Sequence, residues 1–169
     1  MSAPHWIVAV VAAQRLAELV YGQANAARLL EAGGHEVGRG HYPLLVLAHA
    51  GWLAALWFLV PAEAAVNWWL IGFYGLLQGL RVWIIASLGR YWTTRIVTLP
   101  GAALVRGGPY RYLRHPNYLV VTIEIALLPL AFGAWEIAAW FSALNAMLLA
   151  WRLRIENAAL AERRGIESP

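Results

Sequence analysis

The residues best suited to chemistry in this chain lie between positions 106 and 119, in the stretch RGGPYRYLRHPNYL. Three Arg, one His, three Tyr, two Pro and two Gly fall together there, although the surrounding chain is rich in Leu, Ala, Val, Ile and Trp. Arginine and histidine can hold an anionic group, and tyrosine can contact a ring or a cation. The stretch therefore predicts a polar ligand site in an otherwise apolar protein.

A second pair of candidate residues, Arg152 and Glu156, lies in the later stretch RLRIENAAL. Residues four apart share one face of a helix and are separated by a rise of about 6 Å. Such a pair is either an ordinary surface salt bridge or, because the last apolar segment ends here, part of the same site. In the second case Arg152 is the catalytic residue, because its guanidinium can hold an anionic oxygen of an acceptor. An acceptor that is already ionised needs no strong general base.

The composition places these residues in a membrane protein. Of the 169 residues 61% are hydrophobic and only 13% are charged, whereas soluble domains are about half apolar and a quarter charged. A helix that crosses a bilayer needs about 20 mostly apolar residues. We predict an all-α integral membrane protein that forms one domain over residues 1–169. Its five transmembrane helices are expected at 4–21, 43–60, 66–88, 117–133 and 135–152.

The arginines predict how these helices are oriented. Ten of the 13 arginines fall in segments 22–42, 89–116 and 153–169, which five crossings place on one side, while the other side has two Glu and no Arg. By the positive-inside rule this is the cytoplasmic side. The N-terminus is then outside, and a Gly/Pro-rich loop and a C-terminal helix are cytosolic. The positive charges are all Arg and the chain is rich in Ala, which suggests a GC-rich bacterial genome and hence a bacterial inner membrane as the expected location. The net charge of +4 is thus explained without nucleic acid, and we expect no nucleic-acid partner.

Charged residues within the predicted spans have two interpretations. Arg15, Glu18, Arg81 and Glu124 either join helices through polar contacts or line a site for the acceptor, because charges in a bilayer are costly unless they are paired or face water. We assign Arg81 and Trp92, together with Arg152, to the substrate side. The sequence has no Cys, which excludes disulfides and thiol chemistry.

The segment 89–116 mixes helix breakers with apolar residues, so we expect it to pack back on the helices and hold a polar ligand. The alternative is a basic loop that lies on anionic lipid headgroups. His115 precedes Pro116 and either contacts the ligand or caps the next helix. His41 and Tyr42 either flank an acceptor entrance or anchor the second span at the interface. No partner at metal-ligand spacing accompanies His115, so we predict no metal site.

The motif GPYRYLRHPNY, followed by two apolar segments and RLRIENAAL, resembles the isoprenylcysteine carboxyl methyltransferase family, most closely its short bacterial members. RLAEL, GGHEVGRGHYP, LGRYWTTRI and LPGAALV extend the resemblance over roughly residues 14–160. The Arg-His-Pro-x-Tyr core alone also occurs in phospholipid methyltransferases and membrane sterol reductases. Its combination with the downstream Arg-x-x-x-Glu gives the resemblance its specificity.

The resemblance implies that S-adenosylmethionine is the methyl donor, bound on the cytosolic side, and that a lipophilic acceptor arrives from the bilayer. It also implies that Arg152 faces the acceptor. Two positions depart from the family pattern: Glu156–Asn157 replaces two adjacent acids, and Arg95 stands near a donor-binding Gln of longer members. With Arg114 added from its charge, the expected donor-binding residues are Ala102, Ala103, Leu104, Val105, Tyr110, Arg114, His115, Pro116, Asn117, Tyr118 and Glu156.

The predicted function is therefore S-adenosylmethionine-dependent O-methylation of a carboxyl or acidic hydroxyl on a lipophilic, membrane-borne acceptor. The family's eukaryotic acceptors are prenylated proteins, and short bacterial relatives are associated with alkylpyrone or alkylresorcinol hydroxyls. Membrane lipids are the other expected partners, and the sequence carries no signal for the oligomeric state. Two further functions stay open: an NADPH-dependent membrane reductase of the sterol reductase type, and a non-enzymatic membrane interaction protein.

Overall fold

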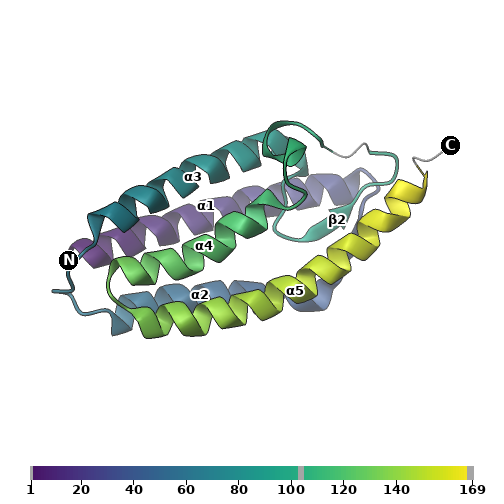
Figure 1. Cartoon of the computed structure of the whole chain (residues 1–169). Coiled ribbons are helices and arrows are strands. Elements are labelled where there is room, and N and C mark those ends of the chain that lie inside the picture. The colour runs from purple at the N-terminus through teal and green to yellow at the C-terminus, as the bar shows by residue number, and fades with distance from the viewer. Residues whose placement is uncertain (1, 103–104, 167–169) are drawn as a thin grey trace.

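In the part of the chain that it describes, a computed structural model contains five long helices, and they run side by side (Figure 1). The structure describes residues 2–102 and 105–166. The prediction of a mostly helical protein is confirmed, and each of the five predicted segments is helical. The helices are α1 (Ala3–Glu31), α2 (Tyr42–Leu59), α3 (Trp68–Leu88), α4 (Pro116–Ala131) and α5 (Trp135–Ile166).

Local sequence signals fix where several helices begin and end. The side chain of Asn67 caps α3 by accepting hydrogen bonds from the N–H groups of Trp69 and Leu70, at 3.1 and 3.3 Å. A proline lies in the first turn of α2 and of α4, where its missing N–H would have no helical partner. Pro129 lies in the last turn of α4, so this helix ends short and a tight turn leads into α5.

The first and last helices are longer than the sequence predicted. The apolar run that suggested a span ends near residue 21, but α1 continues to Glu31. Residues 23–31 contain good helix formers, and no breaker occurs before Gly33 and Gly34. Similarly, α5 is one continuous helix from Trp135 to Ile166, rather than a span followed by a separate cytosolic helix. Loss of hydrophobicity therefore does not mark the end of either helix.

A small antiparallel sheet corrects the expectation of an all-α fold. Strand β1 (His35–Val37) pairs with β2 (Ile96–Thr98), with Glu36 opposite Val97. Strands of three residues are too short for their alternation to stand out in the sequence. The segment 89–116 does pack back on the helices as expected, because Trp92 and Ile96 are buried. It also contains two 3-10 helices, Gly89–Tyr91 and Gly108–Arg111.

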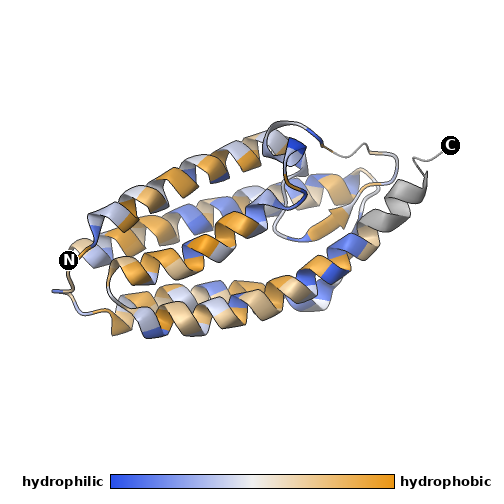
Figure 2. Ribbon diagram, viewed as in Figure 1, coloured by the Kyte–Doolittle hydropathy of each residue, from blue (hydrophilic) through white to orange (hydrophobic). Residues whose placement is uncertain are grey.

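The helices bury apolar residues at the centre of the bundle and also expose many apolar residues on their outer faces. The buried core includes Trp52, Leu56, Ile84, Val120 and Leu128. Hydrophobic residues run along all five helices, whereas hydrophilic ones are frequent at the end where β2 lies (Figure 2). Large exposed apolar surfaces are unusual on soluble monomers. Exposed examples on successive helices are Val10, Leu47, Leu76, Leu119 and Trp140.

Two helical stretches are long and apolar enough to cross a membrane, Arg39–Leu59 and Trp68–Tyr91, and α4 is a shorter apolar helix. This test rests on length and composition, within the part of the chain that the structure describes. It agrees with the prediction of a membrane protein. The five-span topology stays a prediction.

Candidate active site

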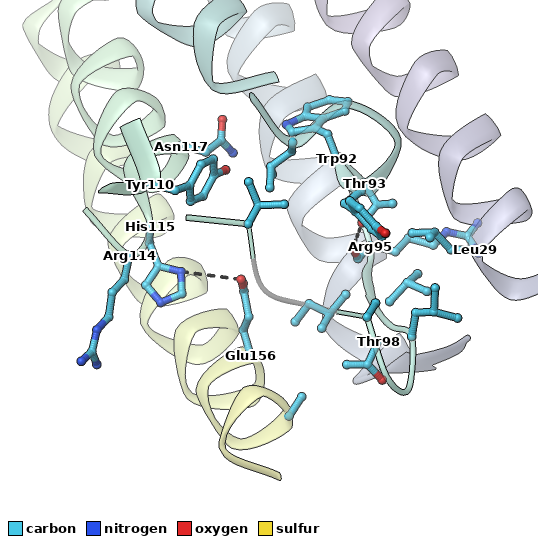
Figure 3. A pocket seen from close by; sticks show the side chains of 18 of the residues that line it. Leu29, Trp92, Thr93, Arg95, Thr98, Tyr110, Arg114, His115, Asn117 and Glu156 are labelled. Carbon is cyan, nitrogen blue, oxygen red and sulfur yellow. Dashed lines mark hydrogen bonds and ion pairs between the residues drawn. The ribbon is translucent and has the colours of Figure 1, made fainter. Parts of the chain in front are cut away.

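A cavity of about 570 Å³ lies at the end of the bundle where the small sheet packs. Its walls come from the segment after α3, from the loop before α4, from the first turn of α4 and from α5. Figure 3 shows Trp92, Thr93 and Arg95 on one side of this space and Tyr110, His115 and Glu156 on the other. The volume lies within the range of small-molecule sites in proteins, roughly 300–1,000 Å³.

Tyr118 connects Arg152 and Glu156, the two candidate site residues of α5. Nε of Arg152 donates to the hydroxyl oxygen of Tyr118 at 2.7 Å, and this hydroxyl donates a short hydrogen bond to Glu156. The guanidinium also lies 5.7 Å from the centre of the Tyr118 ring. Arg152 is 9% exposed, which distinguishes it from a partner in a solvated surface salt bridge. The two residues are thus joined through a third side chain that comes from α4.

His115 contacts the same carboxylate from the other side. Its Nδ1 lies 3.6 Å from Oε1 of Glu156, and its Nε2 lies 3.3 Å from Oδ1 of Asn157. Its ring stacks on that of Tyr118, with centroids 5.3 Å apart. The side chain makes no capping hydrogen bond to α4. His115 therefore turns toward α5 and the cavity instead of capping its own helix.

These contacts shift the protonation of both groups. The hydrogen bond to Glu156 is the main cause that raises the pKa of His115, against the opposing effect of burial. Burial favours the neutral form of Glu156, but hydrogen bonds from His115 and Tyr118 and the charge of Arg152 outweigh it and lower its pKa. Glu156 is thus held as a carboxylate, the form that can receive a cationic or hydroxyl group of a ligand.

The opposite wall is built from the segment that follows α3. The carbonyl oxygen of Thr94 accepts from Nη1 of Arg152 at 2.9 Å. Asn25, on α1, donates to the carbonyl oxygens of Trp92 and Gly89 at 2.9 and 3.2 Å. Arg95 forms an ion pair with Glu36 at 3.3 Å. The backbone of this wall is therefore tied to α1 on one side and to Arg152 on the other.

The loop before α4 is held close to α3 by a glycine. Gly108 has a φ of +56°, and a Cβ at this position would lie 2.2 Å from Oγ of Ser87, so only glycine fits here. The following Tyr110 lines the cavity, and burial together with the charge of Glu156 raises the pKa of its hydroxyl. Asn117 also lines the cavity, and its Oδ1 is buried with no hydrogen-bond partner among the described residues.

The structure brings most of the predicted site residues together. Ala103 and Leu104 lie outside the described residues. Pro116 is buried in the first turn of α4. Arg114 borders the cavity, but its guanidinium points away from it in Figure 3. The other predicted residues in the cavity wall are Ala102, Val105, Tyr110, His115, Asn117, Tyr118, Arg152, Glu156 and Trp92.

Arg81 lies elsewhere, among buried charges of the bundle, where it pairs with Glu18 at 2.7 Å and with Glu124 at 3.2 Å. His41 is buried with its ring 6.0 Å from that of Trp151. Tyr42 contacts Oγ1 of Thr94 at 3.2 Å. His41 and Tyr42 therefore belong to the protein interior beside the site rather than to an exposed interfacial anchor.

Sequence reasoning missed the residues that act through backbone contacts. A carbonyl oxygen such as that of Thr94 is present at every position, so the sequence has no signal for it. Asn25 carried a weak signal, because it is a polar residue in a helical segment that otherwise buries Ala26 and Leu29. Asn157 stands where the family pattern has a second acidic residue, and the structure places its side chain against His115.

The cavity, the Arg–Tyr–Glu connection and the apolar outer faces define a helical protein with a cavity of small-molecule size at one end of its bundle. The model of the isoprenylcysteine carboxyl methyltransferase family matches residues 70–162, more than half of the chain and most of the cavity wall. The chain belongs to this family.

The chain is 37% identical over 161 residues to a Bacillus subtilis (strain 168) protein that is named "Uncharacterized protein YpbQ". The matched region covers 92% of this chain and 95% of that protein. The similarity therefore extends over nearly the whole of both chains. No solved structure matches the chain.

Proposed function

We propose that this protein is an S-adenosylmethionine-dependent O-methyltransferase that acts on a carboxyl or acidic hydroxyl of a lipophilic acceptor. The observation that carries the proposal is the Arg152–Tyr118–Glu156 connection in the wall of the cavity. It joins a carboxylate suited to a cationic donor with a guanidinium suited to an anionic acceptor. Membership of the family supports carboxyl methyl transfer with this donor.

The residues of the cavity fit the donor. S-adenosylmethionine supplies a methyl group activated by a positively charged sulfur, so the protein mainly positions the reactants and balances charge. Glu156, held ionised by its neighbours, would hold the ammonium group or the ribose hydroxyls. Asn117, in the cavity wall, would contact the donor through its side-chain amide. The ring of Tyr110 offers an apolar face for a base or a cation.

Arg152 would orient the acceptor. Its Nε and Nη1 are held by Tyr118 and by the carbonyl oxygen of Thr94, and we assign Nη2 to an anionic oxygen of the acceptor. A guanidinium fixed at two points loses little further freedom when it binds that oxygen. An acceptor that ionises near neutral pH needs no proton removed by the enzyme. This favours a carboxylate or an acidic enol over a simple alcohol.

The proposal includes a bundle of five membrane spans with the cavity at the cytoplasmic surface. The exposed apolar residues on successive helices support it. Helix α4 has 16 residues and rises about 24 Å, which is shorter than the roughly 30 Å hydrocarbon core. His115 and Tyr118 lie at the start of this helix, which in the proposed topology is its cytoplasmic end, where a soluble donor and a lipophilic acceptor can meet.

Two acceptor classes are consistent with this geometry. One is the carboxylate of a prenylated cysteine, and the other is the acidic hydroxyl of a small lipid such as an alkylpyrone or alkylresorcinol. We favour the small acidic lipid because the sequence resembles short bacterial members of the family most closely. The prenylcysteine carboxylate and the enolate of an alkylpyrone each join an anionic oxygen to a long apolar chain, which matches a guanidinium in a bundle with apolar outer faces.

The test uses the purified protein in detergent. Isothermal titration with S-adenosylhomocysteine should show saturable binding, and titration with NADPH should show none. Transfer of a labelled methyl group should then be measured with an alkylpyrone, an alkylresorcinol and a prenylcysteine as acceptors. Binding of NADPH without S-adenosylhomocysteine would support a reductase instead, and binding of neither would support a non-enzymatic role.

A further inference from the structure

Six partly or fully buried polar side chains form a group outside the cavity. They are Gln14, Arg15 and Glu18 on α1, Gln78 and Arg81 on α3, and Glu124 on α4, and we call them the charge network. None of them lines the cavity. The side chain of Glu124 is 2% exposed and that of Arg81 is 7% exposed. The proposed mechanism assigns no role to any member of this group.

The members of the charge network bond mainly to one another. Glu18 receives two hydrogen bonds of 2.7 Å from Arg81 and one of 2.9 Å from Arg15. Oε2 of Glu124 accepts from Arg15 at 2.8 Å and from Arg81 at 3.2 Å, and its Oε1 accepts from Gln78 at 2.6 Å. Two arginines balance two glutamates, and each carboxylate oxygen has a donor. This saturation favours a fixed joint between helices over a ligand site.

Stability alone is a weak reason for such a group. A buried ion pair often contributes no more than well-packed apolar residues of similar volume, because removing its charges from water costs as much as their attraction returns. The rest of the helical core is packed with Val, Leu, Ile and aromatic side chains. What ion pairs add is orientation, because charged hydrogen bonds fix direction and distance as apolar contacts do not.

The three helices that the charge network joins all lead to the wall of the cavity. Gly22 lies about one helical turn after Glu18 on α1, and a Cβ added at Gly22 would lie 2.9 Å from Cγ2 of Thr94. Helix α3 leads directly into the segment that contains Thr94. On α4, Tyr118 precedes Glu124 by six residues. Thr94 and Tyr118 are the two groups that hold the guanidinium of Arg152.

We propose that Glu124 is a positioning residue for Arg152. It is the member of the charge network that belongs to α4, so its bonds to Arg15 and Arg81 set the position of Tyr118 relative to Thr94. That relative position determines whether Nε and Nη1 of Arg152 are held at the same time. The inference rests on the proposed methyl transfer, because it describes how the acceptor-facing guanidinium is aimed.

The first test is kinetic and uses Glu124→Gln, which keeps the shape of the side chain and removes its charge. The single-turnover methylation rate at saturating donor should fall about ten- to a hundred-fold, as expected when a reacting group is misplaced. In an Arg152→Ala background the same change should cost less than about twofold, because Glu124 acts through Arg152. Losses that multiply in the double variant, or an unchanged rate in Glu124→Gln, would overturn the proposal.

Two controls separate positioning from general damage. Glu136→Gln makes the same chemical change at an exposed residue of α5 and should leave the rate unchanged. Ile125→Val removes a buried methylene next to Glu124 and lowers stability without touching a charge. It should reduce the melting temperature but keep the rate per folded molecule, counted by S-adenosylhomocysteine binding. A loss of rate in Ile125→Val as large as that in Glu124→Gln would reduce the charge network to ordinary packing.

The second test does not depend on activity. The sequence has no cysteine, so spin labels can be placed at the exposed positions Val20→Cys on α1 and Leu119→Cys on α4. The distribution of distances between them should be narrow and should broaden or shift in Glu124→Gln. An unchanged distribution would overturn the positioning role. A wild-type protein that binds no S-adenosylhomocysteine would instead overturn the proposed function, while the label distances still decide whether Glu124 fixes α4.

Discussion

Replacing Tyr118 by phenylalanine should separate the two halves of the proposed site. The change removes one hydroxyl, which accepts from Arg152 and donates to Glu156. It leaves the ring, which stacks on His115 and lies beside the guanidinium. The expected effects therefore come from two charged hydrogen bonds and not from lost packing.

The size of each effect depends on the contacts that Arg152 and Glu156 keep when the Tyr118 hydroxyl is removed. A hydrogen bond to a charged group contributes about 1.5–3 kcal/mol. Arg152 would keep the carbonyl oxygen of Thr94, and Glu156 would keep His115, so we take the lower end for each. About 1.5 kcal/mol corresponds to roughly tenfold in either affinity or rate. Tyr118→Phe should thus weaken S-adenosylhomocysteine binding about tenfold and slow methyl transfer at saturating donor by another factor of about ten.

The assay is isothermal titration with S-adenosylhomocysteine, followed by single-turnover transfer of a labelled methyl group. Tyr112→Phe is a matched control, because Tyr112 is 76% exposed in the loop before α4, and it should change neither quantity. Values within about twofold of wild type for Tyr118→Phe, in both measurements, would show that its hydroxyl connects nothing of functional importance. The Arg–Tyr–Glu reasoning would then be refuted.

Two further predictions concern the same charges and the topology. Arg152→Ala should slow methyl transfer by about thirty- to a thousand-fold, corresponding to roughly 2–4 kcal/mol, and should change donor affinity little. Glu156→Ala should instead chiefly weaken donor binding. If both variants have equally small effects on donor binding and on methyl transfer, Arg152 and Glu156 have only a structural role. Reporter fusions after Pro61 and after Arg106 should report opposite sides of the membrane, and the same side for both would exclude the five-span arrangement.

The sequence indicated which residues meet at one end of the cavity because they occur in two short motifs. His115 and Tyr118 lie three apart at the start of α4, and Arg152 and Glu156 lie four apart on α5, so each pair is presented together by its own helix. Only the relative placement of α4 and α5 had to be inferred. The resemblance to the family supplied that placement, and the observed contacts between Tyr118 and both α5 residues agree with it.

The other wall of the cavity could not be predicted in the same way. Its contributions come from the backbone of Thr94 and from strands of three residues, which have neither a distinctive residue type nor a visible periodicity. The role of Arg81 was also ambiguous, because a buried arginine can face a substrate or pair with other helices. Its two carboxylate partners come from α1 and α4, and contacts between distant segments are not visible in a single sequence.

The ion pair between His115 and Glu156 gives the site a pH dependence that can be tested. Because Glu156 raises the pKa of His115, the ion pair is present below that raised pKa and is lost as the pH rises through it. Because the pKa of Glu156 is lowered, the pair is also lost when the pH falls through that lower value. Donor affinity should therefore be highest between the two pKa values and decline on both sides.

A substitution at Asn157 should shift the pH range in which donor affinity is highest. Its Oδ1 lies 3.3 Å from Nε2 of His115, so Asn157→Asp would place a second negative charge beside the imidazole. That charge favours the protonated ring and should raise the pKa of His115 further, although solvent around the exposed Asn157 weakens the effect. The alkaline decline of S-adenosylhomocysteine affinity should move to higher pH, while the acidic decline should move much less. An alkaline decline that stays in place would show that His115 does not control it, and that the contact with Glu156 is not what couples donor binding to pH.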